Sequence, residues 1–511
     1  MLKHIPIMLC AFLLLLPPTG SSQWASRWSV PVRITTSGAD EVHPVFADGF
    51  GWLRDQEELL AFSRNRKNIC LLRTTNAGAG WSDSVVCITT DSADNDFPSL
   101  VRGSYSPSVQ AMLLWQGRRN GNLEILYSRL LQDNWSPPQQ LTNDTADDVM
   151  PHIAAWEGTY YCAWERNGRI MFSEYIANAW SAPRSISDAN DTTCHLPQVT
   201  VEFIDPPAAY TPVVVWEKRR RGSRSRVVMV SLRAGSTWTT PDTLVGDGDN
   251  RRPRFFKYGQ QHVLTWDRVV DARFRTYAGY TSISAGRIGI GSIAPLNSAV
   301  DTSQNASVNG FLIIVSSTPT YYYSASTWEV TGNDSIGVSL IPNMPDGLQR
   351  LRPAGASINR NPTISQGSPA IQFGFAVRFW AVWEAFVANR WQLFCSNAVL
   401  MIRNVGGSNA LPEGFALYQN SPNPITANRG DRTTHIRFTV GRSAFGDRGA
   451  PFVTLKVFDV LGREVATLVN GTVGVGDHSV TLDAGSLPSG VYYYQLAAPN
   501  FIGTRKMMVV R

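Results

Sequence analysis

Residues 151–183 read PHIAAWEGTYYCAWERNGRIMFSEYIANAWSAP, and this stretch decides the fold because variants of it recur along the chain. It holds three landmarks: a proline that opens an apolar strand, an apolar strand that ends in an aromatic and a polar residue, and a Trp-Ser-x-Pro signature. Self-similarity at a fixed period indicates a repeat architecture, in which a single unit cannot bury its apolar face alone.

The aromatic-polar pair sets the period. Its copies are Phe62-Ser63, Trp115-Gln116, Trp164-Glu165, Trp216-Glu217, Trp266-Asp267 and Trp383-Glu384. The first five stand about 50 residues apart, and the last gap is about twice as long. That gap leaves room for one divergent unit around Phe311 to Ser326.

The other two landmarks keep the same order. The Trp-Ser/Thr-x-Pro signature begins at Trp135, Trp180 and Trp238, with a weaker copy at Trp81, and the opening prolines are Pro44, Pro98, Pro151, Pro197, Pro253 and Pro362. Roughly four short strands fit between these landmarks in each unit, as in the blade of a β-propeller. We therefore predict an all-β fold, a propeller of seven blades, or of six if the divergent stretch is absorbed.

The ends of the repeat predict how the ring closes. The last unit, from Pro362 to Cys395, lacks its Trp-Ser-x-Pro strand, and an orphan copy, Trp28-Ser29-Val30-Pro31, stands near the N-terminus. An N-terminal strand that completes the last blade would remove the exposed edges of an open array.

The segment from Thr74 to Trp81 resembles the Asp-box, the Ser-x-Asp-x-Gly-x-Thr-Trp turn of sialidase-like (BNR-type) propellers, with Asn76 in place of Asp and Gly80 in place of Thr. The stretches 128–135, 173–180 and 231–238 keep its register. The resemblance implies a sialidase-like propeller over residues 23–404. In that family an arginine triad, a Tyr/Glu pair and an acidic donor do the chemistry, and no residue here matches those motifs. The catalytic residues are therefore unknown, and a divergent glycoside hydrolase, which would need paired carboxylates, is the alternative to a binding protein.

One face of the propeller should carry both the loops that enter the innermost strands and the hairpins between second and third strands. These segments supply ligand-binding candidates, which are Asp40, Asp94, Asp147, Asp249, Arg64, Arg118, Arg119, Arg166, Arg219 and Arg268. Two interpretations stand. The aspartates shape turns and the arginines neutralise them, or the arginines bind carboxylate or sulfate groups while the aspartates bind sugar hydroxyls or calcium.

The acids that follow the strand tryptophans are weak candidates for catalysis. Alternation along a strand places each Trp and its neighbour on opposite sides, so the Trp should pack between blades. The neighbouring acids are therefore only low-grade candidates for a catalytic acid, and they are Glu165, Glu217, Asp267 and Glu384.

The N-terminus indicates export. Residues 1–22 combine Lys3, an apolar run and small residues, as in a cleavable signal peptide. Export would place the cysteines in an oxidising compartment, where Cys70 and Cys87 flank a turn-like segment and are predicted to form a disulfide. Cys162, Cys194 and Cys395 leave an odd thiol, and no spacing suggests a metal site, so we expect no cofactor other than calcium.

The net charge of +6 is spread along the chain, and its densest cluster, Lys218 to Arg221, lies between two apolar strands. This pattern favours a solvated hairpin turn and argues against nucleic acid as a partner.

After a linker at 405–415, residues 416–511 show period-two strands separated by Asn-Pro, Leu-Gly and Ser-Gly turns, which predict a small Ig-like β-sandwich. The order of these motifs resembles the type A sorting domain of type IX secretion. Its sorting signal would lie in the final strand, at Lys506, Met507, Val509 and Arg511. The resemblance implies recognition by an outer-membrane translocon and a secreted or surface location, peripheral to the outer membrane.

The leading hypothesis is a monomeric, exported propeller that binds an extracellular glycan or protein through its arginine-rich face. The hydrolase and a purely structural surface protein are the alternatives.

Overall fold

A computed structural model describes the two parts of the chain, Met1–Asn404 and Val405–Arg511, as separate compact units. The described residues are 24–25, 28–48, 58–75, 80–82, 84–103, 109–204, 209–258, 261–284, 286–296, 303–313, 321–331, 334–341, 349–365, 368–369, 375–402, 415–426, 432–440, 452–473, 476–498 and 501–510. The predicted signal peptide, the turn at 76–79, most of the linker and Arg511 lie outside them. No helix long and apolar enough to cross a membrane occurs within these ranges.

The described strands of the first unit form seven sheets, and apart from two N-terminal strands in the last sheet each takes its strands in chain order from one repeat. Blade 1 contains β3 (Glu41–Phe46), β4 (Leu59–Arg64), β5 (Asn68–Thr75), β6 (Gly80–Trp81) and β7 (Val86–Cys87). Blade 2 contains β8 (Asn95–Arg102), β9 (Ala111–Arg119), β10 (Asn122–Leu131), β11 (Asn134–Trp135) and β12 (Gln139–Gln140). Blade 3 contains β13 (Asp148–Trp156), β14 (Thr159–Arg166), β15 (Arg169–Ile176), β16 (Ala179–Trp180) and β17 (Arg184–Ser185).

Blade 4 contains β18 (Cys194–Ile204), β19 (Ala209–Arg219), β20 (Arg226–Ala234), β21 (Thr237–Trp238) and β22 (Asp242–Val245). Blade 5 contains β23 (Asp249–Tyr258), β24 (Gln261–Val270), β25 (Arg273–Ser284) and β26 (Arg287–Pro295). Blade 6 contains β27 (Ser303–Ile313), β28 (Tyr321–Val330), β29 (Ser335–Ile341) and β30 (Gln349–Leu351). Blade 7 contains β31 (Ile358–Ile364), β32 (Ser368–Pro369), β33 (Phe375–Val387) and β34 (Arg390–Ile402).

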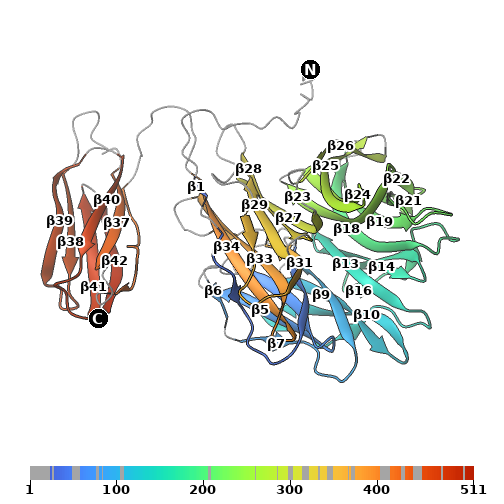
Figure 1. The fold of residues 1–511 in the computed structure, drawn as a ribbon, viewed down its shortest axis with the longest axis horizontal. Helices are drawn as coiled ribbons and strands as arrows, with labels where there is room; N and C mark the ends of the chain where they lie inside the picture. Colours follow the sequence, from blue (N-terminus) through green and yellow to red (C-terminus); the bar gives the residue numbers. More distant parts are fainter. Residues whose placement is uncertain are drawn as a thin grey trace, which may run out of the picture. The chain divides into compact units, whose positions relative to one another are not determined.

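The N-terminal strands complete blade 7, as the broken ends of the repeat predict. Strands β1 (Trp24–Ala25) and β2 (Val32–Arg33) both pair antiparallel with β34. Trp28 is buried in the core that blade 7 shares with blade 6. In Figure 1 the chain colours run round the ring from blue to orange, so that blade 7 meets blade 1. The ring is therefore closed, and it has seven blades.

The divergent unit is blade 6, and it extends beyond the predicted stretch, from Ser303 to Leu351. Its aromatic-polar pair is Trp328-Glu329, and Ala306 stands where the other units have their opening proline. Since both landmarks are displaced or replaced, the period alone located the unit too narrowly.

The strand tryptophans pack between blades, as predicted. Trp115, Trp164, Trp216, Trp266, Trp328 and Trp383 are among the largest fully buried side chains. Each belongs to a core cluster that takes residues from adjacent blades; Trp216, for example, packs with residues of blades 3 and 4.

Every innermost strand is interrupted by a bulge at the same place. The pairing of first and second strands shifts register there in all seven blades. The residue at the bulge has a left-handed backbone, with φ between 48° and 55°, and these bulge residues are His43, Phe97, Met150, Leu196, Arg252, Asn305 and Asn361. A left-handed residue with a side chain costs roughly 1–2 kcal/mol, so the surrounding structure must hold it.

The residue after the strand aromatic supplies that hold. At five of the seven blade junctions its side chain accepts a hydrogen bond from the backbone N–H of the bulge residue in the next blade. The acceptors and their bulge residues are Gln116 and Met150 (3.0 Å), Glu217 and Arg252 (2.9 Å), Asp267 and Asn305 (2.8 Å), Glu329 and Asn361 (2.8 Å), and Glu384 and His43 (2.6 Å). The last of these bonds joins blade 7 to blade 1.

The Ser or Thr of the Trp-Ser/Thr-x-Pro signature also has a fixed partner. Ser128, Ser173 and Ser231 each donate a hydrogen bond to the carbonyl oxygen of that residue, at 2.6 to 2.8 Å. The signature hydroxyl accepts the backbone N–H of the residue that follows each of these serines. The signature thus fastens the short outer strand to the third strand.

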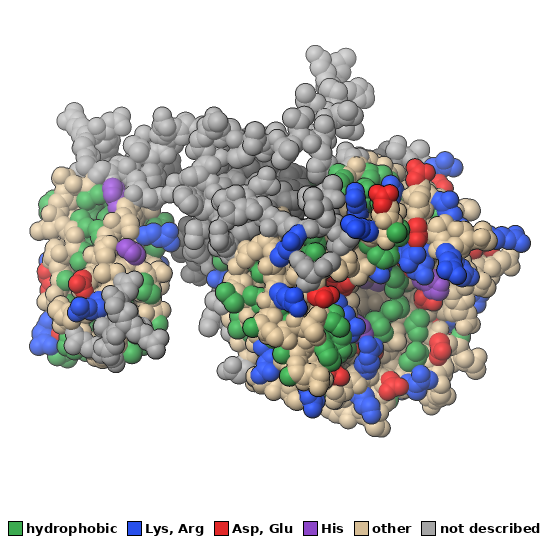
Figure 2. Space-filling model, viewed as in Figure 1, with side chains coloured by type: hydrophobic (Ala, Val, Ile, Leu, Met, Phe, Trp, Pro, Cys, Tyr) green, Lys and Arg blue, Asp and Glu red, His purple; other side chains and the backbone are tan. Residues whose placement is uncertain are grey.

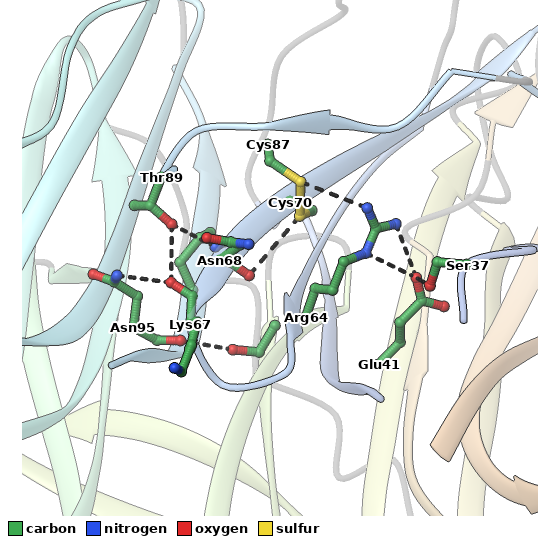
Figure 3. Close-up of a disulfide and its surroundings, with 11 residues drawn as sticks. Ser37, Glu41, Arg64, Lys67, Asn68, Cys70, Cys87, Thr89 and Asn95 are labelled. Carbon is green, nitrogen blue, oxygen red and sulfur yellow. Dashed lines mark hydrogen bonds and ion pairs between the residues drawn. A yellow bond between two sulfur atoms is a disulfide. The ribbon is translucent and has the colours of Figure 1, made fainter. Parts of the chain in front are cut away.

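The cysteines of the propeller divide into one disulfide and three thiols. Cys70 and Cys87 are cross-strand neighbours on β5 and β7, and their sulfurs are bonded at 2.03 Å. Figure 3 shows the pair beside Arg64, whose Nη1 lies 3.8 Å from the Cys87 Sγ. Cys162, Cys194 and Cys395 are buried and unbonded to one another.

The second unit is a β-sandwich. One sheet contains β35 (Ala416–Leu417), β37 (Thr433–Val440) and β40 (Gly476–Asp483). The other contains β36 (Ile425–Thr426), β42 (Phe501–Val510), β41 (Gly490–Ala498), β38 (Phe452–Phe458) and β39 (Glu464–Thr472). A single apolar core lies between them. In the final strand Met507 and Val509 are buried in that core while Lys506 is exposed.

Candidate functional site

A cavity of about 400 Å³ lies on the axis of the propeller. Its described lining takes residues from each of the seven innermost strands, at and just after the bulge, with Thr265 of β24 in addition: 43–46, 48, 97–99, 150–152, 196–198, 252–256, 305, 307–308 and 361–364. A seven-fold repeat of one backbone distortion therefore places seven different side chains round one space.

The ring of bulge residues divides into two continuous arcs. Blades 2, 3 and 4 contribute the apolar side chains of Phe97, Met150 and Leu196. Blades 5, 6, 7 and 1 contribute the polar side chains of Arg252, Asn305, Asn361 and His43. A ligand with one apolar and one polar side would meet a matching wall on each.

Arg254 brings positive charge into the cavity from two positions beyond the bulge of blade 5. Its Nη2 donates to the Asn305 Oδ1 at 2.6 Å, and its Nε and Nη1 have no hydrogen-bond partner among the described residues. Burial lowers the pKa of this guanidinium, and the nearby Asp267 and Glu329 oppose that shift. Because a guanidinium stays charged in proteins, its open donors suit a carboxylate or sulfate.

A chain of hydrogen bonds runs from Arg254 round the polar arc to His43. Asn305 accepts from Arg254 and donates through Nδ2 to the Asn361 Oδ1 at 3.0 Å. Asn361 donates to the Glu384 Oε1 at 2.7 Å, and the same oxygen accepts the His43 N–H. These bonds orient the polar arc across three blade junctions before any ligand arrives.

His43 carries the best-organised titratable group of the lining. Its Nδ1 lies 2.7 Å from the Asp96 Oδ1, and its ring stacks on Phe97 with centroids 4.0 Å apart. Asp96 also accepts from the Phe97 N–H at 2.9 Å and from the Arg66 Nη1 at 2.7 Å. Burial alone would raise the pKa of Asp96, but the contacts with His43 and then with the Phe97 N–H hold it below its usual range.

His152 is the second imidazole of the lining, and it is kept neutral. Its Nδ1 accepts the Val199 N–H at 3.1 Å, which leaves Nε2 to carry the proton. Burial, together with the charge of Arg254, lowers the pKa of His152 to about 4. At neutral pH it therefore offers a hydrogen-bond donor to the cavity.

None of the ten residues nominated on the loop face lines the cavity. Arg64 pairs with Glu41 through Nε and Nη2, at 3.2 and 2.9 Å. Arg166 holds Asp148 through two bonds of 2.6 Å. Both arginines thus bind the first acid of the innermost strand and not the aspartate one residue earlier.

The remaining arginines differ in exposure. Arg119 pairs with Asp91 at 2.9 Å, and the exposed Arg118 lies 3.5 Å from Asp94. Arg268 donates to Asn250 at 3.0 Å. Arg219 is exposed on the β19–β20 hairpin, and no side-chain contact of it is found within the described ranges. Figure 2 shows basic and acidic side chains interspersed over the propeller.

The other nominated aspartates cap backbone groups. Asp40, Asp147 and Asp249 accept the N–H groups of Trp391, Leu123 and Arg226 at 2.7 to 2.9 Å. Each of these bonds reaches a backbone group on another hairpin, at least 23 positions away in the sequence, and not the aspartate's own turn. Within the described residues no group of three or more His, Cys, Asp or Glu side chains is arranged to hold a metal ion.

The acids after the strand tryptophans hold blades together. Glu217, Asp267 and Glu384 are buried and bind the bulge N–H groups described above. Glu165 instead lies 2.9 Å from the His195 Nδ1, and this hydrogen bond raises the pKa of His195. None of the four lines the cavity.

The cavity residues were missed at the level of sequence, although a signal for them exists. In six of the seven units the bulge residue is the one that precedes the opening proline. That position marks the lining once the proline is known to follow a bulge.

Comparison with solved structures finds propellers of low similarity. The haemagglutinin-neuraminidase ectodomain of parainfluenza virus 5 aligns with a TM-score of 0.39 at 10% identity, over 74% of this chain and 85% of that one. The polysaccharide lyase Uly1 aligns with a TM-score of 0.38 at 10% identity, over 70% and 90%. A mutant of AofleA from Arthrobotrys oligospora aligns with a TM-score of 0.35 at 9% identity, over 59% and 90%. The fold rests on the sheets themselves, and no function is drawn from these likenesses.

Comparison with curated proteins finds no match to the sequence. Residues 422–510 match the family model of the secretion system C-terminal sorting domain. The match covers the sandwich from β36 to the final strand, as the order of its motifs predicted. The chain therefore carries, behind its seven-bladed propeller, a C-terminal sorting domain that directs export by the type IX secretion system to the cell surface or beyond.

Proposed function

We propose that the exported propeller binds an acidic extracellular glycan in its central cavity. The observation that carries this proposal is the open guanidinium of Arg254 beside a wall that is apolar on one arc and polar on the other. A sugar ring presents an apolar face of C–H groups and an edge of hydroxyls, and a uronic acid adds a carboxylate for the arginine.

The geometry of the polar arc supports binding with little reorganisation. Asn305 and Asn361 are held by Glu329 and Glu384 as well as by each other. Preorganised donors lower the entropy cost of association, because the side chains need not be ordered by the ligand.

Titration calorimetry on the full-length chain tests the proposal, with oligogalacturonate as the acidic probe and isomalto-oligosaccharide as the neutral one. We expect binding of the acidic probe only. Arg254→Gln should weaken it about 10- to 100-fold, the worth of a hydrogen bond between charged groups. Arg118→Gln removes an equal charge from the loop face and should change nothing.

Two results would count against the cavity. Equal affinity for the neutral probe would remove the role of Arg254. Loss of binding in Arg118→Gln but not in Arg254→Gln would move the ligand to the loop face, where the exposed Arg219 and its neighbours form the second candidate surface, suited to an acidic protein or sulfated glycan.

A further inference from the structure

The cavity contains a group that a binding protein does not need, a histidine arranged as a base. An ionised carboxylate can only accept, so the 2.7 Å contact with Asp96 places the proton of His43 on Nδ1. In the neutral form of the imidazole the lone pair is then on Nε2, which has no hydrogen-bond partner among the described residues, in a side chain that lines the cavity. A carboxylate that fixes the tautomer of a histidine in this way makes the other nitrogen a better base.

The support of Asp96 shows that the pair is a built feature. Besides His43, it receives the Phe97 N–H and the Arg66 guanidinium, so both of its oxygens are engaged. The backbone of His43 is fixed separately by Glu384, and its ring by Phe97. If the His43 ring flipped to exchange Nδ1 and Nε2, the hydrogen bond to Asp96 would break.

The surroundings of His43 narrow the chemistry. Glycoside hydrolysis uses two carboxyl groups, and the described lining includes one acid, Asp48. Acyl transfer by a serine requires the serine hydroxyl to be hydrogen-bonded to the base. No hydrogen bond joins His43 to Ser99 or Ser307, the serines of the described lining. A single base that shares one cavity with an arginine of open donors fits the removal of a proton from the carbon next to a carboxylate.

We propose that His43, held by Asp96, abstracts that proton from a uronate bound at Arg254, and that the chain cleaves acidic polysaccharides by β-elimination. The proposal rests on the binding function above and adds a reaction to it. Asp96 is a positioning residue here, since it acts through His43.

The reaction balances without any further reagent. The His43 Nε2 takes the proton from C5, and the electron pair of that C–H bond forms the C4=C5 double bond. The bond between C4 and the glycosidic oxygen breaks, and this oxygen leaves with a proton from water or from the His43 imidazolium. Arg254 neutralises the charge that builds on the carboxylate as C5 loses its proton.

The test uses the full-length chain with polygalacturonate, alginate and hyaluronan as separate substrates and dextran as the neutral control. The ultraviolet absorbance of the unsaturated uronate measures elimination, new reducing ends measure any cleavage, and calorimetry measures binding. We expect absorbance and reducing ends to rise together with at least one uronate polymer. Neither should rise with dextran.

His43→Asn is the informative variant, because blades 6 and 7 already place asparagine at the same left-handed position. It should fold, still bind the polymer because Arg254 is retained, and lose about 100-fold or more of the elimination rate. His195→Asn removes the other histidine–carboxylate pair, outside the cavity lining, and should keep the full rate. Asp96→Asn should lower kcat and shift its pH profile while KM stays unchanged.

Binding of a uronate polymer without absorbance would overturn the elimination and leave the binding function standing. Reducing ends without absorbance would identify hydrolysis instead. A full elimination rate in His43→Asn would remove the role of the dyad. Absence of binding to all three polymers would contradict the binding function itself, and the elimination with it.

Discussion

Ser396 donates a hydrogen bond from its Oγ to the carbonyl oxygen of Ser29 at 2.6 Å, across 367 positions of the sequence. The same bond joins Ser173 to Ser181 inside blade 3, only eight residues apart. The N-terminal segment therefore reproduces in blade 7, contact for contact, the outer strand that the other units carry themselves.

Closure predicts that Trp28 is worth more than its place near the chain end suggests. Trp28→Ala removes a buried indole and should lower the free energy of unfolding of the propeller by about 3–5 kcal/mol. Urea unfolding followed by tryptophan fluorescence reports this unit alone, because every tryptophan precedes residue 405. Val30→Ala, at a side chain 82% exposed, is the control. Equal stability of both variants would show that the ring does not depend on this strand.

The hydrogen bonds between blades predict that replacing Glu384 lowers the free energy of unfolding strongly. Its carboxylate accepts from the His43 N–H, the Asn361 Nδ2 and the Arg360 Nε, all within 2.7 Å. Glu384→Ala leaves these partly buried donors without their acceptor, and should cost about 3–5 kcal/mol in the same unfolding experiment. Asp94→Ala breaks only the exposed pair with Arg118 and should cost less than about 1 kcal/mol. A small effect at Glu384 would mean that water replaces it.

The disulfide predicts a moderate stabilisation. Cys70 and Cys87 close a loop with a sequence separation of 17. The double variant Cys70→Ala, Cys87→Ala should lose about 3 kcal/mol, since the unfolded chain regains the entropy of that loop. Wild-type protein unfolded in reducing buffer should match the double variant. A variant as stable as the oxidised protein would contradict the prediction.

His152 predicts a loss of stability in acid. Its folded pKa of about 4 lies below the unfolded value of 6.5, so the unfolded chain binds a proton that the folded chain rejects. Stability from this group is complete above pH 6.5 and falls, by on the order of 3 kcal/mol, as the pH drops to 4. His152→Gln retains an acceptor for the Val199 N–H, and its unfolding free energy should fall less than that of the wild type between pH 7 and pH 4.5. Identical losses would refute the assignment.

The final strand predicts two kinds of export defect. Met507 is buried in the sandwich core, so Met507→Ala should destabilise this unit by about 2–5 kcal/mol and make it sensitive to protease. Lys506 is exposed, so Lys506→Ala should leave protease resistance intact. If its side chain belongs to the sorting signal, the secreted fraction should still fall. Protease-resistant, fully exported Met507→Ala would disprove the core role.

The blade number and the closure could be predicted because they depend on landmarks that chain chemistry makes visible. A smaller residue cannot fill the space between two sheets, so the strand tryptophan recurs in most units. The last unit lacks its outer strand, so the orphan copy near the N-terminus had to supply it. Blade 6 was located too narrowly because Ala306 replaces the proline on which the pattern depends.

The cavity could not be predicted because a general rule pointed the wrong way. A residue before proline normally adopts an extended conformation, and His43 or Met150 would then lie in a regular strand. In the structure both are left-handed, at φ of 54° and 55°, and the bulge turns them to the axis. The hydrogen bond that holds each of these backbones comes from a side chain of another blade, Glu384 or Gln116, at least 34 positions away in the sequence. No local sequence pattern reveals such a bond.

The sequence named the charged residues of the loops but did not predict their pairs. Alternation along a strand sends Glu41 and Asp40 to different sides, so Arg64 meets the former while the latter turns to the backbone of Trp391. Composition identifies which residue types share a face, but the direction of each side chain depends on where its strand begins.

The three buried thiols allow the opening of the propeller to be measured by chemical labelling. Burial raises the pKa of Cys194 and of Cys395 to about 12, so neither forms a reactive thiolate while the fold is intact. At these described thiols a thiol-specific dye added to native protein would therefore react only as blades separate, and its rate of uptake there would record how often the ring opens.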